Sequence, residues 1–110
     1  MRKPVSTFAP SIRFEIFIAG DYAQAKQICR KWTLEVGACV TVEPVDYIYT
    51  GGEEQGIRVG LINYPRFPTD HDALYAKTRA LAEELMIGLC QLSYSIVGPE
   101  TTEWVSRRPE

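Results

Sequence analysis

An α+β fold of the ferredoxin-like type, a split βαβ sandwich, is predicted by three features of the sequence. Segments with alternating and with helical periodicity follow one another in the order β-α-β-β-α-β, with a short extra strand at the C-terminus. Right-handed crossovers between the strands place both helices on one face of an antiparallel sheet. A chain of 110 residues that is 45% hydrophobic has apolar content for one core, so a single domain is expected.

The first part of the chain predicts an arm, a strand and a helix. Residues 1–10 hold two prolines and no periodicity, so we expect a flexible N-terminal arm before a domain of residues 11–110. The stretch "SIRFEIFIAG" alternates in polarity, which predicts a strand with one buried face. Asp21 then begins a helix that ends at Gly37, because aspartate caps helix N-termini and glycine accepts the left-handed conformation that follows a helix.

One strand is expected on each side of "GGEEQG". Residues 38–50 are rich in β-branched and aromatic side chains, but Pro44 cannot donate to a ladder, which predicts an edge strand. Residues 57–64 contain more apolar positions, which indicates a central strand. Glycine supplies the positive φ that hairpins need, so residues 51–56 are predicted to form a mobile, solvent-exposed loop.

The C-terminal half predicts a long helix and a closing pair of strands. The loop "PRFPTD" leads into a helix of about residues 70–90. Its apolar stripe consists of Leu74, Thr78, Leu81, Leu85 and Leu89. The segments "LSYSIV" and "TEWVSR", joined by "GPE", then complete the sheet.

Composition narrows the classes of function. A net charge of −2 lacks the basic surface that nucleic-acid binders use, so no nucleic-acid partner is expected. No apolar run is long enough to span a bilayer, and no membrane association is expected. Three cysteines without a close pair, and a single histidine, do not form a zinc-binding pattern. They indicate reduced thiols and therefore a cytoplasmic protein.

The acidic residues of the hairpin raise the question of a metal site. The predicted topology places Asp21 on the same rim of the sheet as Glu53 and Glu54. The residues that matter for a resemblance are Tyr49, Gly51, Gly52, Glu53 and Glu54. They resemble the hairpin of the diguanylate cyclases of the GGDEF type, which implies a Mg²⁺-dependent enzyme acting on nucleotides. The sequence has Gln55 where that family has Phe, and a solvated hairpin is the interpretation that we favour.

Two other groups of residues are candidates for ligand binding. Tyr64, Arg66 and Phe67 lie in the proline-stiffened loop, where arginine offers a bidentate anion clamp beside an aromatic ring. Tyr47 and Arg58 are expected on the sheet face away from the helices, which large aromatics suggest is covered by a partner or a ligand.

Together these features predict a non-enzymatic binding or accessory module without a cofactor. We expect a homodimer that recognises a protein partner or a small polar ligand. One alternative is a metal-dependent nucleotide enzyme that uses Asp21, Glu53 and Glu54. The other is a small-molecule enzyme with a pocket near the loop of residues 64–71.

Overall fold

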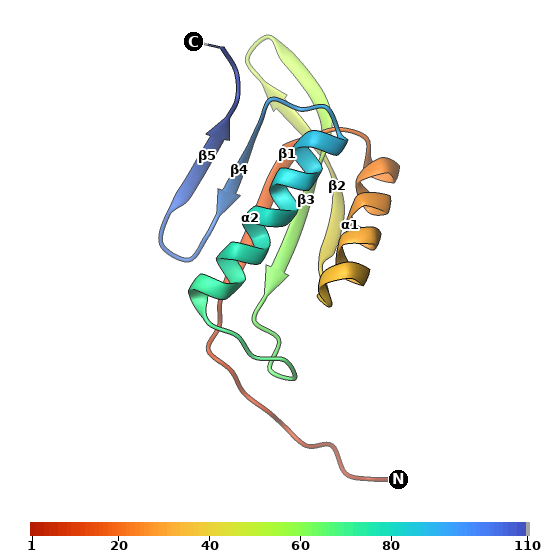
Figure 1. Ribbon diagram of the computed structural model, residues 1–110, viewed down its shortest axis with the longest axis vertical. Coiled ribbons are helices and arrows are strands. Elements are labelled where there is room, and N and C mark those ends of the chain that lie inside the picture. The colour runs from red at the N-terminus through yellow and green to blue at the C-terminus, as the bar shows by residue number, and fades with distance from the viewer. Residues whose placement is uncertain (110) are drawn as a thin grey trace.

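A computed structural model describes residues 1–109 and consists of a five-stranded antiparallel sheet with two helices on one face (Figure 1). The elements are β1 (Arg13–Ala19), α1 (Tyr22–Val36), β2 (Thr41–Tyr49), β3 (Gly52–Ile62), α2 (His71–Gly88), β4 (Ser93–Val97) and β5 (Thr102–Ser106). The strand order is β2-β3-β1-β4-β5. This is a split βαβ sandwich with one strand added at its edge, which confirms the predicted fold.

The core lies between the sheet and the helices. Along β1, buried and half-buried side chains alternate, with Ile16 fully buried opposite Val59 of β3 and Ile96 of β4. The predicted stripe of α2 packs onto these strands, and its Leu81 and Leu85 have no exposed surface. Burial of these apolar side chains is the main stabilising contribution of the fold.

Both helices begin at the capping residues that the sequence indicates. The carboxylate of Asp21 accepts a hydrogen bond from the amide of Gln24 at 2.8 Å, and Gly37 ends α1 with φ of 75°. Asp70 caps α2 in the same way through the amide of Ala73. These side chains satisfy amide donors that would otherwise lack a partner in the first turn.

The β2–β3 hairpin differs from the prediction of a loop at residues 51–56. The turn consists only of residues 50–51, and β3 begins at Gly52, which pairs with Tyr49. Of the three glycines in "GGEEQG", only Gly51 has a positive φ, of 82°. A Cβ atom at Gly52 would lie 2.5 Å from the Tyr49 ring, and one at Gly56 would lie 2.4 Å from the Tyr47 ring. These two glycines therefore make room for aromatic rings, and residues 52–56 form a paired strand.

This hairpin extends beyond the rest of the sheet. The last residue of β1, Ala19, pairs with Gly56, so the part of the hairpin nearer its turn pairs only with itself (Figure 1). The outer strand β2 contains Pro44 and lies at the edge of the sheet, as predicted.

Asn63 joins the N-terminal arm to the loop before α2. It is 6% exposed, and its backbone amide donates to the carbonyl of Ile12 at 3.0 Å. Its side chain donates to the carbonyl of Pro10 and accepts from the amide of Thr69, each at 2.8 Å. Before Pro10 the arm runs away from the domain without helix or strand (Figure 1). Within residues 1–109, neither helix has the length and apolarity needed to cross a membrane.

Candidate functional site

The sheet face away from the helices carries several large side chains. The strand registers place Phe17 of β1, Arg58 of β3 and Tyr47 of β2 on this face, as predicted. Trp104 of β5 and Tyr49 lie on the same face, and their side chains are 64% and 54% exposed. Exposed aromatic rings on an open sheet are typical of a surface that binds a partner protein or a ligand.

A hollow of about 230 Å³ lies on this face near the hairpin, and we call it the hairpin-end hollow. Its lining residues are Phe17, Ile18, Ala19, Tyr47, Glu54, Gln91, Ser93, Tyr94, Ser95, Trp104 and Arg108. They come from segments spread along the chain and include one carboxylate and one guanidinium. The arrangement offers aromatic faces, one negative charge and several hydroxyl groups to a ligand.

Pairing within the hairpin fixes the position of the tyrosine in this hollow. Tyr47 is the direct partner of Glu54 across the β2–β3 ladder. Its ring lies over Gly56, and its hydroxyl donates to the carbonyl of Ile57 at 2.6 Å. Burial raises the pKa of Tyr47, so the phenol keeps its proton at neutral pH.

Arg58 is engaged in an ion pair beside the hollow. Its guanidinium donates to the carboxylate of Glu43 at 2.9 Å, on the neighbouring strand. This hydrogen bond is the main reason that the pKa of Arg58 is raised. Arg58 was a candidate for ligand binding, but its charge is already matched, which leaves Arg108 as the cation that lines the hollow.

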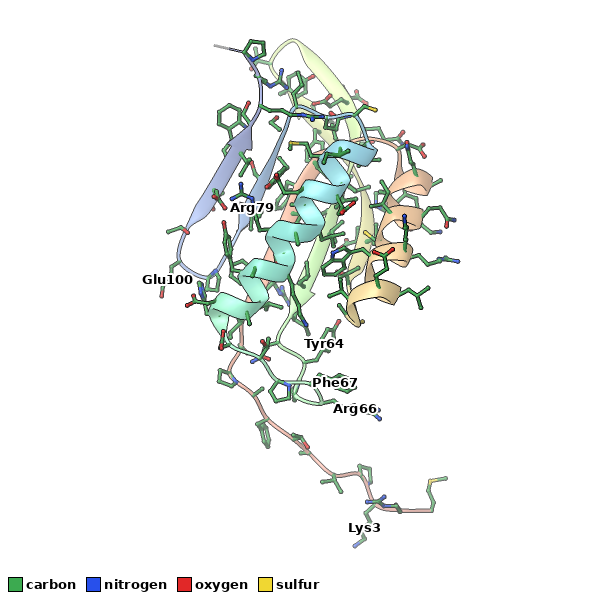
Figure 2. The ribbon with its side chains drawn as sticks, viewed as in Figure 1. Lys3, Tyr64, Arg66, Phe67, Arg79 and Glu100 are labelled. Atoms are coloured by element: carbon green, nitrogen blue, oxygen red, sulfur yellow. The ribbon has the colours of Figure 1, made fainter. Side chains whose placement is uncertain are left out.

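The other predicted ligand residues meet at the opposite end of the sheet. A cavity of about 620 Å³, which we call the loop-end cavity, lies between α1, α2 and the loop before α2. Its lining residues are Thr33, Gly37, Ala38, Cys39, Leu61, Ile62, Tyr64, Arg66, Phe67, Thr69, Leu74 and Lys77. Figure 2 shows Tyr64, Arg66 and Phe67 together in the loop beneath the two helices. The prediction of a pocket near residues 64–71 is thus matched by a cavity in the structure.

Tyr64 lies beyond the strand that was predicted for residues 57–64, because β3 already ends at Ile62. It follows the end of β3, and its side chain turns toward the helix side of the sheet to line the cavity. There its hydroxyl accepts a hydrogen bond from Cys39 with a sulfur–oxygen distance of 3.5 Å. The sulfur of Cys39 can also accept the phenol proton, and this interaction, followed by burial, raises the pKa of Tyr64. The loss of strand periodicity after Ile62 is the signal that was overlooked.

The acidic residues of the hairpin do not converge. Glu53 and Glu54 are neighbours in a strand, so their side chains point to opposite faces of the hairpin. Asp21 is occupied by the cap of α1. Within residues 1–109, no group of three histidine, cysteine, aspartate or glutamate side chains is placed to hold a metal ion. The geometry therefore gives no support to a site built on these three carboxylates.

A third polar cluster connects α2 to the last hairpin. Arg79, labelled in Figure 2, pairs with Glu103 of β5 at 3.3 Å, and Tyr75 donates to the same carboxylate at 2.6 Å. Tyr94 donates to Glu83, and burial together with this hydrogen bond raises the pKa of Tyr94. Apart from Arg79 Nε, which is buried without a hydrogen-bond partner, these groups bond to one another, and we assign them a structural role in holding α2 against β4 and β5.

Comparison with solved structures identifies a likeness over the whole chain. A phage SAM lyase in the apo state matches with a TM-score of 0.70 and 12% identity, over 98% of this chain and 99% of that chain. A phage SAM lyase in complex with S-methyl-5′-thioadenosine matches with a TM-score of 0.63 and 11% identity, over 96% of each chain. CutA from Synechococcus elongatus matches with a TM-score of 0.38 and 18% identity, over 90% and 77%. No family model and no curated protein sequence matches the chain.

These matches correct the prediction of a non-enzymatic binding or accessory module. At such low identity the likeness establishes the fold alone, and the fold shared with the phage proteins is one that an enzyme uses. The prediction rested on the lack of a recognisable catalytic motif. In this fold the residues around the hollow come from all five strands, so no contiguous motif can identify them.

Proposed function

We propose that the protein is a lyase that cleaves a sulfonium nucleoside of the SAM type and releases S-methyl-5′-thioadenosine. The observation that carries the proposal is the likeness to the phage SAM lyase, which covers both chains almost completely. The structure with S-methyl-5′-thioadenosine supports the class of nucleoside. The proposal agrees with the sequence-based alternative of a small-molecule enzyme in the class of function, but it places the site at the opposite end of the sheet from the loop of residues 64–71.

We propose the hairpin-end hollow as the substrate site because of its residue chemistry. Trp104 and Tyr47 offer ring faces to an adenine base, and aromatic faces also attract a sulfonium cation. Glu54 supplies a negative charge beside them, and Arg108 can bind the substrate carboxylate. The loop-end cavity has two cationic residues and no carboxylate in its lining, so it suits a sulfonium poorly.

The chemistry requires little from the protein. When the bond from sulfur to the γ carbon of the amino-acid part breaks, the electron pair stays on sulfur, which becomes a neutral thioether. The γ carbon gains an electron pair if the substrate's own carboxylate oxygen attacks it and closes a lactone ring, which needs no base and no water. The negative oxygen and the positive sulfur both become neutral in this step, and an apolar aromatic surface favours such a loss of charge.

A second copy of the chain would complete this site. The volume of about 230 Å³ is below the range of about 300–1,000 Å³ that is usual for small-molecule pockets. Trp104, which lines the hollow, and Tyr49 on the same face are exposed and would be covered by a partner's open sheet. The proposed assembly is therefore a homo-oligomer through this face, with a dimer as its smallest form. Cys29, Cys39 and Cys90 are free thiols, which fits a cytoplasmic location.

The test is incubation of the purified protein with SAM, with chromatography to measure S-methyl-5′-thioadenosine and mass spectrometry to identify the four-carbon product. We expect multiple turnovers and a lactone. Trp104→Ala should weaken binding of S-methyl-5′-thioadenosine by about tenfold, because stacking on a base contributes about 1–3 kcal/mol. Phe67→Ala is the matched control, since Phe67 is an exposed aromatic at the other end of the sheet. If the wild-type protein neither cleaves SAM nor binds the nucleoside, the proposal fails.

Glu54→Gln separates attraction of the cation from proton abstraction. Glu54 is exposed, so loss of its charge should raise KM for SAM only about twofold to fivefold, with kcat unchanged. A fall in kcat of about a hundredfold would instead identify a general base and an elimination that gives an alkene.

A further inference from the structure

The loop-end cavity has a buried apolar floor that the proposed reaction does not use. Leu61 and Leu74 form part of its lining and are only 2% and 4% exposed. Ala38 and Phe67 add apolar surface from the end of α1 and from the loop. A cavity of about 620 Å³ lies within the usual range for small ligands, and such walls favour a ligand with an apolar body.

The charged groups at this cavity have one sign. Arg66 and Lys77 are its only charged lining residues. Within the part of the chain that the structure describes, neither of them forms an ion pair, which is also true of exposed cations such as Arg30 and Lys31; what sets Arg66 and Lys77 apart is their place beside an apolar cavity whose lining has no carboxylate. The Arg66 guanidinium rests over the ring of Phe67, 5.4 Å from its centroid (Figure 2). Two cations without a protein counter-charge indicate an anionic ligand.

A carboxylate suits this site better than a phosphate. The nearby N-terminus of α2 is already capped by Asp70, which accepts from the amide of Ala73 at 2.8 Å, so this negative side chain occupies the usual place of a phosphate. The apolar floor also penalises burial of a multiply charged group. One carboxylate can remain at the rim beside Arg66 and Lys77 while its hydrocarbon part enters the cavity.

From this geometry we infer that the loop-end cavity binds the monoanion of an apolar carboxylic acid, at a second site separate from the hairpin-end hollow. The inference does not rest on the proposed lyase activity. The ligand's hydrocarbon part contacts Leu61 and Leu74, and its carboxylate meets Arg66 and Lys77. A ligand in this position covers Cys39, which lines the cavity and is accessible in the empty protein.

Cys39 therefore provides a direct measurement of occupancy. The full-length protein is treated with a maleimide with and without octanoate below its micellar range, and modification of each cysteine is followed by peptide mass spectrometry. Cys90 is exposed at the other end of α2 and is the control within the same molecule. We expect octanoate to slow modification of Cys39 severalfold and to leave Cys90 unchanged. Absence of protection, or equal protection by octan-1-ol and octylammonium, overturns the inference.

Two variants test the role of the cations. Arg66→Gln and Lys77→Gln should each raise the octanoate concentration that protects Cys39 by about fivefold, as expected for partly exposed charge pairs. Lys31→Gln is the matched control, because Lys31 is an exposed lysine of α1 outside the cavity. If octanoate protects Cys39 at the same concentration in all three variants as in the wild-type protein, its carboxylate does not bind at Arg66 and Lys77, and the inference fails.

Discussion

The two ends of the sheet differ in how the side chains of their candidate sites are held. At the hairpin end, Tyr47 and Glu54 face each other across a ladder, and the register of the strands determines where they lie. At the loop end, Arg66 and Phe67 lie in a connection stiffened by prolines and anchored through Asn63. The hairpin end offers a carboxylate on an open aromatic face, and the loop end offers cations around a cavity. One small domain thus presents two surfaces with different charged groups, a carboxylate and a guanidinium at the hairpin end and two cations at the loop end.

The largest effect is expected from the core beneath the loop-end cavity. Leu61→Ala removes a side chain that is 2% exposed and should destabilise the protein by about 2–5 kcal/mol, as measured by chemical denaturation. The change should also alter octanoate protection of Cys39 and leave nucleoside binding at the hairpin end intact. Leu34→Ala is the control, because Leu34 is 85% exposed and its loss should cost no more than about 0.5 kcal/mol. Equal effects of the two changes would show that the cavity floor has been misassigned.

Replacing a glycine of β3 by alanine should have a larger effect at the hairpin end than in the middle of the strand. A Cβ at Gly56 would lie 2.5 Å from the carbonyl oxygen of Ile18 and would displace the Tyr47 ring. Gly56→Ala should therefore destabilise by about 1–3 kcal/mol and weaken nucleoside binding. In the control Gly60→Ala, the new methyl group meets only the Thr41 side chain, which can rotate away. A smaller loss for Gly56→Ala than for Gly60→Ala would contradict this account.

The pKa values of two tyrosines, one at each end of the sheet, are raised for different reasons, and titration can separate them. The pKa of Tyr64 is raised mainly by its hydrogen bond with Cys39, whereas the pKa of Tyr47 is raised mainly by burial. Cys39→Ala should lower the pKa of Tyr64 toward its ordinary value, so more phenolate forms at a given alkaline pH. The pKa of Tyr47 should not move. Phenolate absorbance, with Tyr64→Phe and Tyr47→Phe to assign the transitions, measures both, and a shift at Tyr47 would refute the separation.

The smallest effect is expected at the carboxylate beside Glu54. Glu53 is exposed and does not line the hollow. Glu53→Ala should change stability by no more than about 0.5 kcal/mol and should leave KM for SAM unchanged. Calorimetry with Mg²⁺ should give the same heat for the variant and the wild-type protein. Tight binding that Glu53→Ala abolishes would restore the metal-dependent alternative.

Features set by local physics were predictable from the sequence. The alternation around Ile16 and the caps at Asp21 and Asp70 each depend on neighbours in the chain, and each appears in the structure. The edge position of the strand that contains Pro44 was also predictable, because it depends only on the missing amide proton of the proline. With right-handed crossovers, the order of the elements also predicted the split βαβ arrangement that the strand order shows.

The glycines and the sites depended on contacts that the sequence does not reveal. Gly52 and Gly56 accept rings from the opposite strand, and that role is visible only when the register is known. Trp104 is an exposed tryptophan on a short last strand, and its alternation could have placed it on the open face. Cys39 and Lys77 join Tyr64 only through tertiary folding, so sequence spacing gave no indication of either.

The three hydrogen bonds of Asn63 have a mechanical consequence. One amide side chain holds the point where the arm enters the sheet and the loop that closes the cavity. Tension applied to the N-terminus is therefore transmitted to the cavity wall before it reaches the hairpin. The amide protons of Asn63 and Thr69 should accordingly exchange together, because both hydrogen bonds are lost when Asn63 is displaced.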